Sequence, residues 1–205
     1  MQVCLRHRHS GVLWGVVLGL LFATDGLRAK IASDFFDKLE AGDAKSIVAV
    51  SHLKSMDDLC LLLRCVHVKR FGTHSFQVKD AVIAALKEIP GHAKELGDRI
   101  EKLSGKFGTA RERWSLFGAL ESLASPEAVA QIGRFLLDSR HLVVEGHDDY
   151  DPYGDTNSHI AACAMTEALG DRPQPMFYRR NELNYWKVWW QSEDAEKYRR
   201  LLREK

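Results

Sequence analysis

Two apolar helices joined by a very short turn, within residues 110–138, most strongly constrain the fold of this sequence. The first helix carries an apolar stripe at helical spacing, formed by Leu116, Phe117, Leu120, Leu123 and Ala124. Ser125 is a good N-cap, Pro126 suits the first helical position, and Glu127 complements the positive helix end. The apolar residues of the second helix are Ala128, Val129, Ile132, Phe135 and Leu136. One hairpin cannot bury both apolar faces alone, so the pattern predicts a helical repeat.

An alanine followed by a large apolar residue recurs in three helical segments of the chain. Ala85-Leu86, Ala119-Leu120 and Ala164-Met165 occupy equivalent positions in three helical segments, at spacings of 34 and 45 residues. The excess of 11 residues in the second spacing matches what a long connection at 139–156 would add. Because no stretch alternates like a strand for long enough to compete, we expect an all-α fold.

The remaining helices follow from periodicity and from their end signals. We expect one or two short helices in 33–54, a helix in 55–71 begun by Ser55, and a helix in 76–89 stopped by Pro90-Gly91. A partner helix precedes Gly105, and another helix begins near Asn157 or Ser158 as its cap. A tail from Arg179 closes with a charged amphipathic helix.

Residues 1–29 have the pattern of a secretory signal peptide. A basic start is followed by an apolar run from Gly11 to Ala23, and Ala29 offers a small residue for cleavage before Lys30. The run is shorter than the roughly 20 residues that a membrane-spanning helix needs. We therefore expect cleavage after Ala29, a periplasmic or secreted protein, and no stable membrane span once the signal is removed.

Charge and cysteine content narrow the class of protein further. The whole chain has a formal charge of +1, and three basic residues and one acidic residue lie within 1–29. The remainder is therefore nearly neutral, which argues against a general nucleic-acid binder. Cys60 and Cys65 lie five residues apart on a predicted helix and should not pair, and Cys163 reads as a small core residue. So few cysteines favour a bacterial envelope over a disulfide-built extracellular module.

These residues resemble the HEAT-like helical repeats. The run from Ala119 to Val129, with its Ser-Pro-Glu turn, and the closing Leu136-Leu137-Asp138 look like one unit of that family, and Ala168-Leu169-Gly170-Asp171 is similar to its helix-end pattern. The part from Asn157 through Trp190 also looks like the closing segment of exported bacterial repeat proteins.

The resemblance implies a right-handed α-solenoid of about three to four hairpins. The single domain 30–205 would then comprise N-terminal cap helices (30–72), repeats (73–176) interrupted by the connection at 139–156, and a tryptophan-containing C-terminal cap (177–205). Repeat frameworks of this kind host many functions, so the fold alone does not name one.

The connection at 139–156, here called the acidic segment, is the first candidate site. Its carboxylates and imidazoles could supply metal ligands, and the weak candidates are His147, Asp149, Asp151, Asp155 and His159. The calcium-loop template fails, because the position that needs glutamate holds Ile160. A turn-rich surface loop is the simpler interpretation. Tyr150 and Tyr153 favour a third one, a partner-binding lip, because tyrosines supply contact area at interfaces.

Trp186, Trp189 and Trp190 share one face of a predicted helix. They either pack against the last repeat or form an exposed aromatic platform for a sugar or peptide.

The sequence offers no assembled catalytic residues. It lacks the Gly-x-Ser-x-Gly, phosphate-loop and His-Glu-x-x-His motifs. We therefore expect a non-enzymatic protein without cofactor that mediates protein–protein interaction or scaffolding with an unidentified protein partner. The alternatives are an envelope protein that binds metal or glycan through the acidic segment or the tryptophans, and a HEAT-like lyase or enzyme-associated subunit.

Overall fold

The computed structural model describes residues 33–106, 109–138, 140, 156–170 and 179–204. Backbone contacts divide the chain into Met1–Lys30 and the compact unit Ile31–Lys205, and every described residue belongs to the second unit. Within the described residues there are ten α-helices and two short 3-10 helices, with no strand. The expectation of an all-α fold is confirmed.

Three helices form the N-terminal part, and the start of the third follows the predicted capping signal of Ser55. They are α2 (Ser33–Glu40), α3 (Ala44–Val50) and α4 (Met56–His67). Gly42, with φ of +74°, adopts the left-handed conformation between α2 and α3. Asp43 then caps α3 by accepting from the Ser46 amide at 2.8 Å. Ser55 caps α4 in the same way by accepting from the Asp58 amide.

The next hairpin forms where the sequence predicts it. After the 3-10 helix η1 (Gly72–His74), α5 (Ser75–Lys87) buries Val78, Val82, Ala85 and Leu86 completely. Gly91, at φ of +74°, reverses the chain into α6 (His92–Leu103).

The hairpin that anchors the sequence analysis comprises α7 (Ala110–Leu123) and α8 (Pro126–Gly133). Ser125 caps α8 by accepting from the Ala128 amide at 3.2 Å, as expected. Ala124 does not widen the apolar stripe of α7, and that expectation is wrong. It lies exposed in the left-handed conformation that ends the helix, with φ of +47°.

The C-terminal part comprises α9 (Asn157–Ala168), α10 (Arg179–Gln191), η2 (Glu193–Ala195) and α11 (Glu196–Leu201). Neither Asn157 nor Ser158 is the cap of α9, contrary to the expectation. Thr156 takes the extended backbone of a cap and accepts from the His159 amide at 3.2 Å. Asn157 is the first residue of the helix, and its side chain bonds to other elements.

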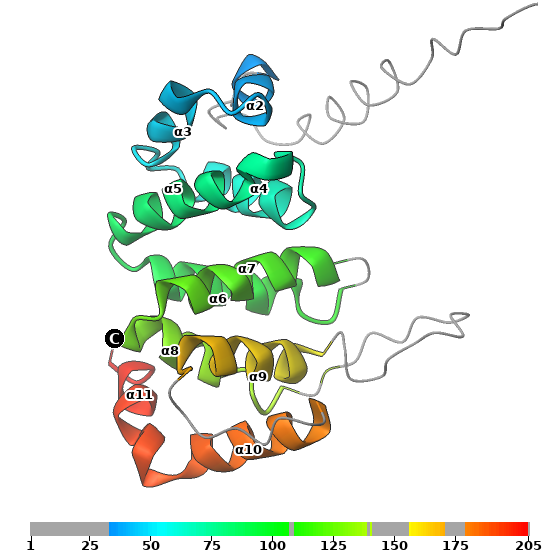
Figure 1. Cartoon of the computed structure of the whole chain (residues 1–205). Coiled ribbons are helices and arrows are strands. Elements are labelled where there is room, and N and C mark those ends of the chain that lie inside the picture. Colours follow the sequence, from blue (N-terminus) through cyan, green and yellow to red (C-terminus); the bar gives the residue numbers. More distant parts are fainter. Residues whose placement is uncertain (1–32, 107–108, 139, 141–155, 171–178, 205) are drawn as a thin grey trace, which may run out of the picture. The chain divides into compact units, whose positions relative to one another are not determined.

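Contacts within Ile31–Lys205 divide the helices into two layers. Figure 1 shows the helices of these layers in succession, from α3 and α4 to α9 and α11. In the first layer, α3, α5, α7 and α9 pack each against the next. In the second layer, α6 packs on α8 and α8 on α11. Helix α4 lies against both α5 and α7, and α10 covers α9. The three Ala-Leu or Ala-Met pairs therefore lie in successive helices of the first layer, and all six residues are buried.

Among the described helices, none combines the length and the apolar character needed to cross a bilayer.

Candidate functional site

The residues that flank the acidic segment meet at one point on the helices. The Ser158 amide donates to the Asp138 carbonyl oxygen at 3.1 Å, and Asn157 Nδ2 donates to Asp138 Oδ2 at 2.7 Å. The end of the α8 segment, at Asp138 in the second layer, therefore lies within hydrogen-bonding distance of the start of α9 in the first layer. We call Ser104, Arg113, Asp138, Arg140 and Asn157 the stem cluster.

Asn157 is the centre of the stem cluster. This residue is 2% exposed, and its side-chain amide makes three hydrogen bonds, two through Nδ2 and one through Oδ1. Nδ2 donates to Ser104 Oγ at 2.5 Å as well as to Asp138, and Oδ1 accepts from an Arg113 guanidinium nitrogen at 2.7 Å. Ser104 in turn donates to the Ile100 carbonyl at 2.7 Å. One side chain therefore joins the end of α6, the first turn of α7 and the start of α9.

Arg113 brings a buried positive charge to this point. It is 2% exposed and projects from the first turns of α7. Burying a guanidinium is costly unless it is hydrogen-bonded, and the Asn157 carbonyl supplies one such bond. The segment 139–156, which follows Asp138 in the sequence, contains five acidic residues.

Asp138 and Arg140 form the outer half of the stem cluster. Arg140 donates to both carboxylate oxygens of Asp138, at 2.8 and 2.7 Å, and to Glu101 of α6 at 2.8 Å. Burial raises the pKa of the Asp138 carboxyl, but the hydrogen bonds from Arg140 and Asn157 outweigh it and hold that pKa below its ordinary value. The pKa of Arg140 is raised by the hydrogen bonds to Asp138 and Glu101. Asp138 and Arg140 are therefore both ionised at neutral pH.

Most of the predicted site residues lie outside the described part of the chain. These are His147, Asp149, Asp151 and Asp155 of the metal hypothesis, and Tyr150 and Tyr153 of the partner-binding hypothesis. His159 is described: it is 1% exposed and lies against Cys163. Among the described residues, no group of three or more metal-ligating side chains comes together.

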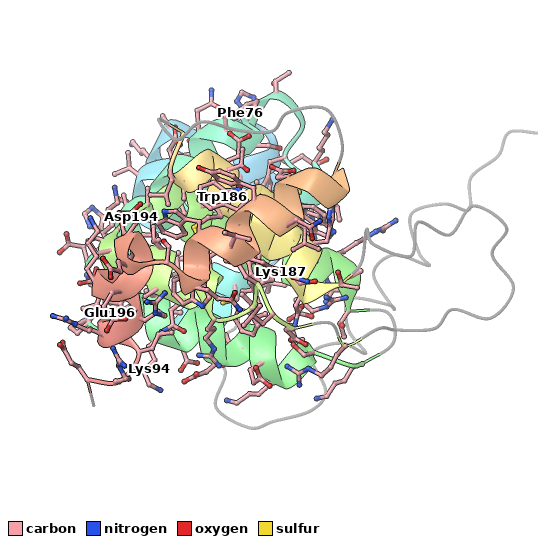
Figure 2. All side chains as sticks on the ribbon, turned by 90° about the horizontal axis from the view of Figure 1, so that it is seen from below. Phe76, Lys94, Trp186, Lys187, Asp194 and Glu196 are labelled. Carbon is pink, nitrogen blue, oxygen red and sulfur yellow. The ribbon has the colours of Figure 1, made fainter. Side chains whose placement is uncertain are left out.

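The three tryptophans pack inside the C-terminal hairpin. Trp186, Trp189 and Trp190 are 0%, 6% and 6% exposed. Trp186 meets Trp189 edge to face at 5.3 Å between ring centroids, and its indole nitrogen donates to Thr166 Oγ1 of α9 at 2.8 Å. Figure 2 shows Trp186 among the helices, whereas Phe76 projects at the periphery. The described rings thus form no exposed aromatic platform, because each residue is at most 6% exposed and Trp189 packs against Tyr198 of α11.

Sequence reasoning missed a shallow cleft of about 480 Å³ in the second layer. It lies between the α5–α6 turn, α8 and the end of α11. Lys87, Glu88, Lys94, Glu127 and Glu204 give its lining charges of both signs. Three segments distant in sequence form it, so no local pattern could have indicated it.

Sequence reasoning also missed the roles of Arg113 and Asn157. Asn157 was predicted as a possible helix cap, and no sequence feature distinguished Arg113 from the other charged residues near it. A polar residue at a predicted helix start, next to a break in periodicity, was the available signal, but its partners lie 44 and 53 residues away.

No family model, no curated protein and no solved structure matches this chain.

Proposed function

We propose that this chain is an exported, non-catalytic HEAT-like repeat protein that presents the acidic segment to a protein partner. The single observation that carries the proposal is the stem cluster, which holds Asp138 and Asn157 together on a stack of helical hairpins. Insertions in repeat proteins commonly map to one face and often to the binding face. A segment whose two ends are fixed at one point can be displayed without disturbing the helices on either side.

The right-handed solenoid is part of this proposal. It is supported by the two layers of successive contacts, in which α5 and α6, and then α7 and α8, alternate between layers. The repeated Ala85-Leu86, Ala119-Leu120 and Ala164-Met165 pairs support it too, because small residues on a stripe allow close helix approach.

The chemistry of the segment supports a protein partner. Residues 139–156 combine five acidic residues with Tyr150 and Tyr153. Tyrosines provide amphipathic contact area, and the acidic residues would favour a basic partner surface by steering its approach. The buried tryptophans of α10 give no support to a glycan-binding role.

Export rests on residues 1–29, and it is tested separately. Expression in a Gram-negative host, followed by fractionation and intact-mass measurement, should give a periplasmic or secreted species that begins at Lys30. A full-length cytoplasmic species would contradict export while leaving the binding role open.

The binding role is tested by site-specific photo-crosslinking in the native envelope. We expect a photoreactive residue at position 150 to give a discrete protein adduct, and the same residue at the exposed Asn184 of α10 to give none. A chain with 141–155 replaced by a short Gly-Ser linker should keep its melting temperature, because the stem cluster remains, and should lose the partner. The absence of adducts at both positions, or retention of the partner by the shortened chain, would overturn this function.

A further inference from the structure

Helix α9 carries a histidine and a cysteine one turn apart. His159 and Cys163 have the i, i+4 spacing that places two side chains on one face. His159 Nε2 and Cys163 Sγ lie 3.6 Å apart, so the imidazole nitrogen and the sulfur face each other.

This separation matches a shared metal ion. Zinc bonds sulfur at about 2.3 Å and histidine nitrogen at about 2.0–2.1 Å, and a tetrahedral angle between these bonds puts the two donor atoms about 3.6 Å apart. A linear two-coordinate ion would require the same donors to lie more than about 4 Å apart, given bonds of these lengths. The observed 3.6 Å fits the tetrahedral case.

Burial fixes one ligand and leaves the other accessible. His159 is 1% exposed, so the packing of α9 holds its ring in place. Cys163 is only half-buried, so part of this residue is exposed to solvent. One turn further along, Thr166 accepts from Trp186 and donates to Glu182 of α10, which ties this part of α9 to α10. A rigid imidazole beside a partly exposed cysteine is a preorganised pair of ligands.

We propose that His159 Nε2 and Cys163 Sγ form a two-ligand site for Zn²⁺ or a similar borderline divalent ion. Among the described residues no group of three ligands forms, so water would complete the coordination. On binding, the thiol releases its proton to solvent and the neutral imidazole donates its lone pair. The site is independent of the proposed partner-binding role, because neither residue belongs to the stem cluster.

The other two cysteines provide a natural contrast. Burial raises the pKa of the Cys60 thiol to about 12 and also raises that of Cys65. Both lie on α4, and neither has a histidine within contact that the structure records. A low thiolate fraction makes both poor ligands, so Cys60→Ser is a matched control for Cys163→Ser.

The test is titration of the full chain with Co²⁺ under reducing conditions, followed by competition with Zn²⁺. We expect a near-ultraviolet thiolate-to-cobalt absorption band that Zn²⁺ abolishes. Cys163→Ser should remove the band, and His159→Gln should weaken cobalt affinity more than about 10-fold, the loss that even an outer-shell substitution causes. Cys60→Ser and His92→Gln should leave the band unchanged.

Two further outcomes decide the inference. Because His159 is buried, its variant is checked by circular dichroism, and Cys163→Ser, a near-isosteric change at a half-buried position, tests the site if that variant is unfolded. A wild-type chain without the band at millimolar Co²⁺ would show that the pair is a thiol–imidazole hydrogen bond only. A band that survives Cys163→Ser would also overturn the assignment.

Discussion

Two connections flank helix α8, and they are stabilised by different kinds of interaction. The α7–α8 turn depends on neighbours: Ala124 ends α7, and Ser125 accepts from an amide three residues away. The α8–α9 connection depends on the stem cluster, in which Asn157 bonds to residues 44 and 53 positions distant.

The difference shows how sequence encodes each connection. Residues 124–126 favour the first turn by their own conformational preferences, before any tertiary contact exists. The second connection closes only after α6, α7 and α9 are already adjacent, since they supply Ser104, Arg113 and Asn157. We expect substitutions in the second connection and its surroundings to cost more, because they leave buried polar groups without partners or crowd packed helices.

Gly133, the last residue of α8, gives the largest expected effect. A Cβ built there would collide with the ring of Trp190, which is buried on α10. Gly133→Ala should therefore lower the free energy of unfolding by about 2–3 kcal/mol, as overpacking of a core does. Gly118→Ala is the matched control, because nothing lies within 4 Å of its Cβ position in α7. It should stabilise by about 0.5–1 kcal/mol through helix propensity. Urea unfolding measures both, and equal effects would contradict the model of a packed α8–α10 contact.

Asn157→Ala gives the next largest effect. It leaves Arg113, Ser104 and Asp138 each short of one hydrogen bond, and we expect a loss of about 2 kcal/mol. Asn184→Ala, at an exposed position of α10, should change stability by less than about 0.5 kcal/mol. The two variants are compared by urea unfolding, and hydrogen exchange locates the loss. Similar losses for both variants would mean that water can replace the hydrogen bonds of Asn157 at little cost in the free energy of unfolding.

The helix starts were predictable because their signals are local. Ser55 and Ser125 each cap a helix through an amide three residues later, as the capping rules predicted. Asp43 caps α3 in the same way, but it was not among the predicted caps. The same rules placed the cap of α9 at least one residue too late, because Thr156 is the cap. The Asn157 side chain instead forms hydrogen bonds to Arg113, Ser104 and Asp138. The Ala-Leu pairs predicted the buried faces of α5, α7 and α9 for the same local reason.

The candidate site was predictable only in its position along the chain. The break in periodicity after Asp138 indicated where to look, but not which residues from other helices meet there. Arg113 reads as one of several charged residues at the start of α7, and only tertiary packing makes it buried. The 3.6 Å approach of His159 to Cys163 likewise depends on rotamers that spacing alone does not fix.

Acid should weaken the second connection more than the first. The pKa of Asp138 is lowered in the folded chain, so this carboxylate adds stability above its unfolded pKa of about 3.9, and that stability is lost as the pH falls through the folded value. The stability difference between the wild type and Asp138→Asn should therefore narrow between pH 7 and pH 3. Asp80→Asn, on the exposed side of α5, is the control for charge removal. A difference that stays constant with pH would show that Asp138 acts through packing and not through its charge.

Ala124 gives the smallest effect, and one of opposite sign. Its φ of +47° is unfavourable for any residue with a Cβ, whereas glycine adopts this conformation without that cost. Ala124→Gly should therefore stabilise the protein by about 0.5–1 kcal/mol, which is the steric relief less the entropy that glycine loses on folding. Ala84→Gly, at an exposed position inside α5, has no such strain to relieve and should destabilise by about 1 kcal/mol. Opposite signs in thermal unfolding would show that the left-handed backbone conformation of Ala124 costs stability. Destabilisation by both variants would mean that the Ala124 methyl makes contacts whose loss outweighs the strain.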